Sequence, residues 1–116
     1  LSAADVHMAS LRPEWSGIAV PSKFFGSLAI GRPVLYAGPK ASAISQWIEK
    51  FDVGWVVNMD NVDDIASELR ALAKAPHSIA KLQDRAFNVY AEEFSRNSVT
   101  ERWHSELSAV LSNEPV

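Results

Sequence analysis

Ser22 and Lys23 are the residues whose types and position most directly suggest a chemistry, the binding of a phosphate group. They lie within residues 17–34, which read GIAVPSKFFGSLAIGRPV. A serine hydroxyl can donate a hydrogen bond to a phosphate oxygen, and a lysine ammonium adds a mobile point charge. Both residues precede a predicted helix, whose first N–H groups and dipole attract anions. The plainer alternative is that Ser22 only caps this helix and that Lys23 is a solvated first-turn residue.

The elements around this pair follow the order strand, loop, helix, strand. A strand-like apolar run at residues 18–20 is followed by a proline, and residues 23–30 then carry apolar side chains at helical spacing. Gly31 suits the position just after a helix, where a positive φ costs a glycine little, and Pro33 prevents the helix from continuing. Residues 34–37 are predicted to form the next strand.

Strands and helices alternate along the first half of the chain, and helices follow in the second half. This order predicts an α/β fold, a doubly wound, Rossmann-like parallel sheet with flanking helices. Strands are expected at residues 6–11, 34–37 and 55–57, and helices at 23–30, 43–51, 61–75, 78–94 and from 95 or 97 to about 111. Because open sheets of this kind have about five or six strands, we expect further strands upstream of Leu1. Residues 1–116 are predicted to form a single partial or complete domain, with a helical carboxyl-terminal part at about 61–112.

The ligand of such a sheet is expected beyond the carboxyl ends of its strands. Three loops are predicted there, at residues 12–17, 21–23 and 38–42. In the last of them Ser42 either faces an anion or belongs to a plain turn. Trp15 either stacks on a ligand ring or packs against its own loop.

The predicted helices carry apolar side chains along one face. The last helix carries a stripe, and three of the four tryptophans fit core or inter-element packing. The stripe comprises Val99, Trp103, Leu107, Val110 and Leu111, and the three tryptophans are Trp47, Trp55 and Trp103.

Composition and spacing exclude several classes of function. The net charge is −3, which gives no reason to expect nucleic-acid binding, and no apolar run is long enough to suggest a membrane span. There is no cysteine, and His7, His77 and His104 do not pair at ligand spacing, so we expect no metal site and no cofactor. No nucleophile pattern appears, so no catalytic residue is assigned. Residues 12–40 carry four cations and one acid, which would favour an anionic partner.

Residues 5–57 resemble the carboxyl-terminal domain of family-four glycosyltransferases of the GT-B fold, most closely a bacterial subgroup that builds surface polysaccharides. The PSK and A-x-G-R-P-V elements within GIAVPSKFFGSLAIGRPVLYAG carry the resemblance, together with ADVHMASL and SAISQWIEKFDVGWVV. It implies that this chain is the later half of a donor-binding domain and that the substrate-binding residues are Gly17, Ile18, Ala19, Val20, Pro21, Ser22 and Lys23.

The resemblance also implies partners and a setting. The donor would be a nucleotide-diphosphate sugar, a UDP-sugar first and a GDP-sugar as the alternative, and the acceptor a glycan or a lipid-linked glycan. An amino-terminal Rossmann-like domain is expected upstream. The parent enzyme would be cytoplasmic, at the inner face of the membrane, and these 116 residues alone are expected to be inactive.

Two positions depart from the pattern of this family. The family usually has two glutamates separated by seven residues, at the places that Ile18 and Gly26 occupy here, and Glu14 has the wrong spacing to replace either. In the family the second glutamate binds the ribose, so this contact is in question. The usual arginine and lysine that neutralise the leaving diphosphate lie upstream of the matching segment.

Two other function classes are compatible with the sequence. One is a non-catalytic nucleotide-binding module, although the acid pair and the aspartate of a receiver domain are not found. The other is a protein-interaction domain that uses the last two helices.

Overall fold

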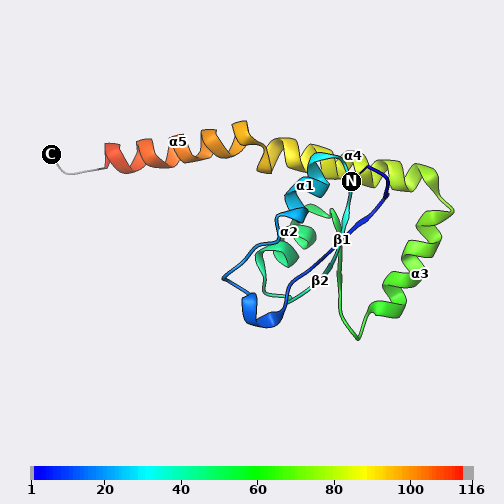
Figure 1. Cartoon of the computed structure of the whole chain (residues 1–116). Helices are drawn as coiled ribbons and strands as arrows, with labels where there is room; N and C mark the ends of the chain where they lie inside the picture. Colours follow the sequence, from blue (N-terminus) through cyan, green and yellow to red (C-terminus); the bar gives the residue numbers. More distant parts are fainter. Residues whose placement is uncertain (1, 114–116) are drawn as a thin grey trace.

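The computed structural model describes residues 2–113 and contains a parallel sheet of three strands (Figure 1). The strands are β1 (His7–Ser10), β2 (Val34–Ala37) and β3 (Gly54–Val57), in the order β1-β2-β3. The register pairs His7 with Val34 and Val34 with Gly54. The predicted α/β fold is confirmed, and a parallel sheet with flanking helices is consistent with a Rossmann-like fragment.

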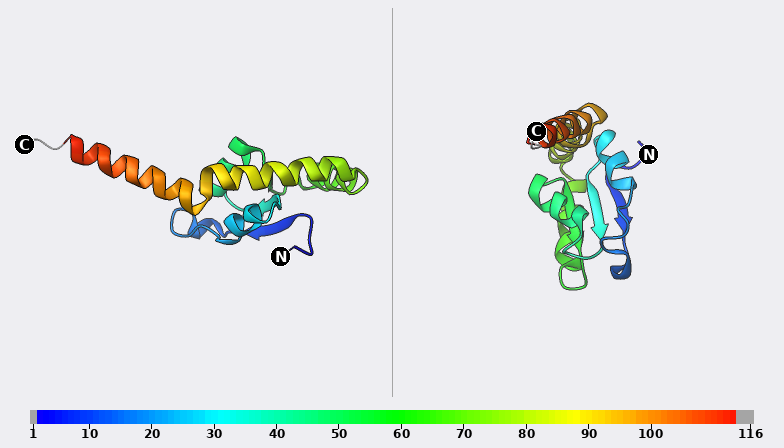
Figure 2. Two further views of the ribbon diagram at one scale, coloured as in Figure 1. Left: turned by 90° about the horizontal axis from the view of Figure 1, so that it is seen from above. Right: turned by 90° about the vertical axis from the view of Figure 1, so that its left-hand side faces the viewer.

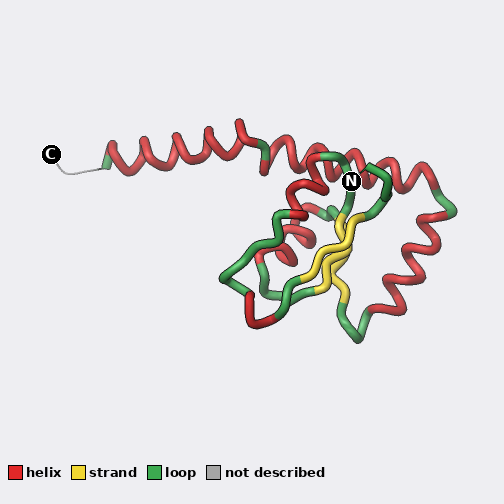
Figure 3. Tube along the Cα trace, viewed as in Figure 1, coloured by secondary structure: helices red, strands yellow, loops and turns green. Residues whose placement is uncertain are grey.

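The helices lie on both sides of this sheet, as Figure 3 shows. Helices α1 (Lys23–Ala29) and α2 (Ala43–Phe51) connect the strands and pack on one face, and α3 (Val62–Ala73) lies beside β3 on the other side. A short 3₁₀ helix, η1 (Pro13–Trp15), follows β1. Residues 18–20 form no strand, because the chain turns tightly here, with the N–H groups of Ile18 and Ala19 both donating to the Trp15 carbonyl at 3.0 Å.

Two of the predicted helix caps are formed. Ser42 Oγ accepts the N–H of the residue three positions on at 3.4 Å, and Ser95 Oγ does the same for α5 (Arg96–Ser112) at 3.2 Å. Ser22 also directly precedes its helix, but it has helical φ and ψ angles and makes no capping bond. Gly31 follows α1 with φ of 70°, as its position predicts.

Helix α4 (Pro76–Val89) starts two residues earlier than predicted. Pro76 directly follows the helix predicted at residues 61–75, but it occupies the first turn of α4. A proline is favoured there because the first N–H groups of a helix have no intrahelical partner, so a missing N–H costs nothing. A π-helical turn, η2 (Tyr90–Phe94), then joins α4 to α5.

The core lies between the sheet and helices α1 and α2. Val34 and Tyr36 of β2 are fully buried against Phe24 and Leu28 of α1 and Ile44 of α2. Around this core, five aromatic side chains from α1, α2 and η2 form a cluster: Phe24, Phe25, Trp47, Phe51 and Phe94. Through this cluster η2 packs against α1 and α2, the two helices that cover one face of the sheet.

Helix α5 leaves the rest of the chain and extends away from it, as Figure 2 shows. The prediction that Trp103 fits core or inter-element packing is therefore wrong. Trp103 is 64% exposed, and Leu107, Val110 and Leu111 are exposed as well, whereas Trp55 is buried and Trp47 joins the aromatic cluster. The helical period was correct, but periodicity alone does not say whether a partner surface is present.

Candidate functional site

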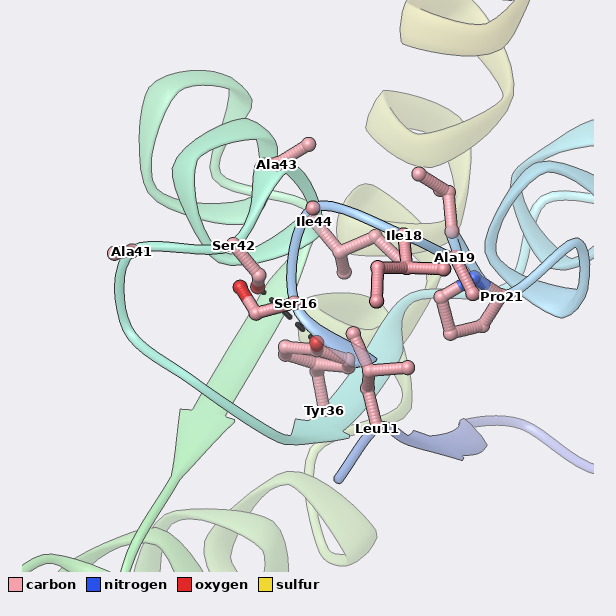
Figure 4. A pocket seen from close by; sticks show the side chains of 12 residues that line it. Leu11, Ser16, Ile18, Ala19, Pro21, Tyr36, Ala41, Ser42, Ala43 and Ile44 are labelled. Atoms are coloured by element: carbon pink, nitrogen blue, oxygen red, sulfur yellow. Dashed lines mark hydrogen bonds between the residues drawn. The ribbon is translucent and has the colours of Figure 1, made fainter. Parts of the chain in front are cut away.

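The predicted ligand loop lies at the carboxyl end of β1, next to the loop that follows β2 (Figure 4). Gly17 has φ of 82°, a conformation that favours glycine, and it lets the chain turn back from η1 toward α1. Because parallel strands end at the same edge, this loop and residues 38–42 lie together as predicted. Trp15, in the preceding turn, is 55% exposed.

A cavity of about 250 Å³ separates these two loops (Figure 4). Five of the seven predicted binding residues line it: Gly17, Ile18, Ala19, Val20 and Pro21. The other lining residues are Leu11, Ser16, Tyr36, Ala41, Ser42, Ala43 and Ile44. Of these, only Ser42 was singled out as a candidate from the sequence, because its loop follows a strand.

Ser22 and Lys23 line a second hollow, of about 500 Å³, on the other side of Pro21. Met8, Ala9 and Ser10 of β1 complete its lining. Pro21 thus borders both hollows, and the predicted binding residues are divided between them. Ser22 and Lys23 line the larger hollow, and residues 17–20 line the smaller one.

A partly buried pair of hydrogen bonds fixes the backbone at the start of α1, including that of Lys23. Ser27 Oγ donates to the Lys23 carbonyl at 2.6 Å and lies 2.8 Å from His7 Nδ1. Ser27 is buried, so this contact ties the first turn of α1 to β1. The Lys23 side chain itself is exposed at the rim of its hollow.

The four cations of residues 12–40 do not all line the candidate site. Arg32 precedes β2, at the opposite edge of the sheet from Lys23, and its guanidinium donates to the carbonyl oxygens of Ser2 and Gly31 at 3.2 and 3.4 Å. Lys40 is exposed in the loop after β2 but lines neither hollow. Lys23 is therefore the cation that lines the candidate site.

The two positions of the missing glutamates differ in their surroundings. Ile18 is 81% exposed at the cavity. Gly26 lies within α1, and a Cβ atom placed on it would have no neighbour within 4 Å. A side chain at position 26 would fit sterically, so the absence of a carboxylate there is not forced by packing.

Two other kinds of site are not found among residues 2–113. No group of three or more His, Asp or Glu side chains is placed to hold a metal ion. In the same residues, no helix combines the length and the apolar character needed to cross a lipid bilayer.

The chain is similar to a known protein. This relative is a probable glycosyltransferase, WbjE, of Pseudomonas aeruginosa, which is 29% identical over 103 residues. The match covers 82% of this chain and 26% of the relative, so the chain spans about a quarter of the relative's length. No protein-family model and no solved structure matched the chain. The comparison supports a relationship to glycosyltransferases.

Proposed function

We propose that this chain is the nucleotide-sugar donor-binding part of a glycosyltransferase, a piece of the carboxyl-terminal domain of a family-four GT-B enzyme. The observation that carries the proposal is the pair of hollows on either side of Pro21, at the edge of the sheet where ligands of α/β folds bind. The similarity to a probable glycosyltransferase supports it.

In this proposal the two hollows bind different parts of the donor. Ser22 and Lys23 contact the diphosphate, and Lys23 offsets the negative charge that develops as the diphosphate leaves. The loop at residues 17–20 approaches the rest of the donor through its backbone. The parent enzyme transfers the sugar to a glycan or a lipid-linked acceptor, and an upstream Rossmann-like domain supplies the acceptor site. These 116 residues alone therefore bind the donor without transferring its sugar.

Lys23→Ala is expected to weaken the binding of the diphosphate about five- to tenfold, because it removes a charge-assisted contact at a solvent-exposed site. Isothermal titration of the chain with UDP-glucose, and separately with GDP-mannose, measures this change. Lys40→Ala is the matched control, because it removes a lysine from a neighbouring loop that lines neither hollow. Equal affinities of the Lys23→Ala variant and the wild type for both donors would refute the assigned role of Lys23.

A protein-interaction role is the second candidate, and the exposed apolar side chains of α5 favour it. Trp103, Leu107 and Leu111 follow one another at intervals of four residues along a helix that extends from the sheet domain. This surface lies apart from the two hollows, so the two roles do not exclude each other.

A further inference from the structure

The cavity beneath residues 16–21 has a lining without charge. Its polar side chains are three hydroxyls, those of Ser16, Tyr36 and Ser42, and no acid, lysine, arginine or histidine lines it. Burying an ionised group where no opposite charge can pair with it is strongly unfavourable. The cavity therefore suits an uncharged group that can exchange hydrogen bonds with hydroxyls.

The Tyr36 hydroxyl is held in a fixed place at this cavity. The Tyr36 side chain is fully buried, and a Cβ atom at Gly38 would lie only 2.4 Å from its oxygen. Because Gly38 has no side chain, the hydroxyl end of the Tyr36 ring fits beside it. A group fixed in this way loses little conformational entropy when it binds a ligand.

The hydrogen bonds around Tyr36 leave a donor for a ligand. Ser42 Oγ donates to Tyr36 Oη at 3.1 Å, and Figure 4 shows this bond within the cavity lining. Ser45 Oγ donates its own proton to the Pro39 carbonyl at 2.8 Å. Ser42 Oγ also lies 3.2 Å from Ser45 Oγ, and it has a single proton to donate to one of the two oxygens. In the arrangement in which Ser42 donates to Tyr36, the phenol proton is available to an oxygen atom of a ligand.

The remaining wall of the cavity is apolar. Figure 4 shows Leu11, Ile18 and Ile44 around the hydroxyls. Val20 lines the same cavity, and both Ile18 and Val20 are exposed. A pyranose ring has hydroxyl edges and apolar C–H faces, so it can use both kinds of surface at once. A phosphate group can accept hydrogen bonds from hydroxyls, but it has no apolar face for the rest of this wall.

We infer that Ser16, Tyr36 and Ser42 form the recognition set for the uncharged sugar ring of the donor, while the diphosphate lies across Pro21 beside Lys23. The inference rests on the proposed function. It adds the residues that bind the sugar ring, and it adds that this sugar carries no carboxylate. Tyr36 is the specificity-determining residue of the set, because it is the hydroxyl with the most restricted position.

The test compares how tightly UDP-glucose and UDP bind to the full chain and to two variants. Tyr36→Phe keeps the buried ring and removes only the hydroxyl, so it should weaken UDP-glucose about fivefold and leave UDP unchanged. Ser45→Ala is the matched control, because it removes a hydroxyl from the same network that does not line the cavity. Thermal melting of each variant checks that it is folded at the titration temperature.

The outcomes separate this inference from the proposed function. A Tyr36→Phe variant that binds both ligands like the wild type would overturn the inference and leave donor binding intact. Equal weakening of UDP and UDP-glucose would place the nucleoside in the cavity and would also overturn it. UDP-glucuronate adds a carboxylate to the same sugar, and equal affinity for UDP-glucuronate and UDP-glucose would contradict the assignment of an uncharged ring. If neither UDP-glucose nor UDP binds the wild type, the proposed function and the inference both fail.

Discussion

Gly54→Ala is expected to destabilise the sheet severely, by about 3 kcal/mol or more. Gly54 begins β3 and pairs with Val34 of the central strand. A Cβ atom added at Gly54 would lie 1.9 Å from the Val34 carbonyl oxygen and 2.8 Å from the Val34 nitrogen. Both are backbone atoms of a hydrogen-bonded strand, so the clash can be relieved only by separating β2 from β3. Urea unfolding, followed by circular dichroism, measures the loss in the free energy of unfolding.

Gly26→Ala is the matched control for this substitution. Gly26 lies within α1, where an added Cβ has no neighbour within 4 Å. Alanine is the better helix former, so this variant should gain about 0.5–1 kcal/mol in the free energy of unfolding. If Gly54→Ala were as stable as the wild type, the β2–β3 register described above would be wrong.

Phe24→Ala is expected to cost about 3–5 kcal/mol in the free energy of unfolding, as is usual for the loss of a fully buried aromatic ring. The Phe24 side chain is completely buried, and its ring centroid lies 5.4 Å from that of Phe25, 5.8 Å from that of Trp47 and 5.9 Å from that of Phe94. Removing it opens a cavity where α1, α2 and η2 meet. Because most domains are stable by only about 5–15 kcal/mol, the variant should unfold at a much lower urea concentration.

Trp103→Ala is the control for the Phe24 substitution, because it removes a larger aromatic side chain from an exposed site on α5. We expect a change within about 0.5 kcal/mol, as for most surface substitutions. A loss at Trp103 as large as that at Phe24 would show that α5 is packed on the fold in solution.

Much of the fold could be predicted because its signals are local. The strand at residues 34–37 and the helix at residues 43–51 have the predicted bounds, since Pro33 and Ser42 specify their starts. The start of α4 was missed because Pro76 is compatible both with the end of one helix and with the first turn of the next. The exposure of Trp103 was missed because an apolar stripe gives the face of a helix and not its partner.

The candidate site could be predicted only in part. The loop at residues 21–23 was predicted from its position after a strand-like run and before a helix, whereas residues 17–20 were assigned to ligand binding by the family resemblance alone. Pro21 separates the cavity at residues 17–20 from the hollow that Lys23 lines. This separation depends on the backbone turn at Gly17, which has a positive φ, and the spacing of residues in the sequence does not specify that turn. Tyr36 was interpreted as a strand residue, since nothing in its local sequence shows that its hydroxyl meets Ser42 from the next loop.

Amide chemical-shift mapping during a titration with UDP-glucose, repeated with GDP-mannose, tests donor binding most directly. The proposed function predicts saturable shifts that cluster at residues 15–23 and in the loop at residues 38–44, which surround the two hollows. Saturable shifts confined to α4 and α5, or no shift at millimolar concentrations of either donor, would contradict it.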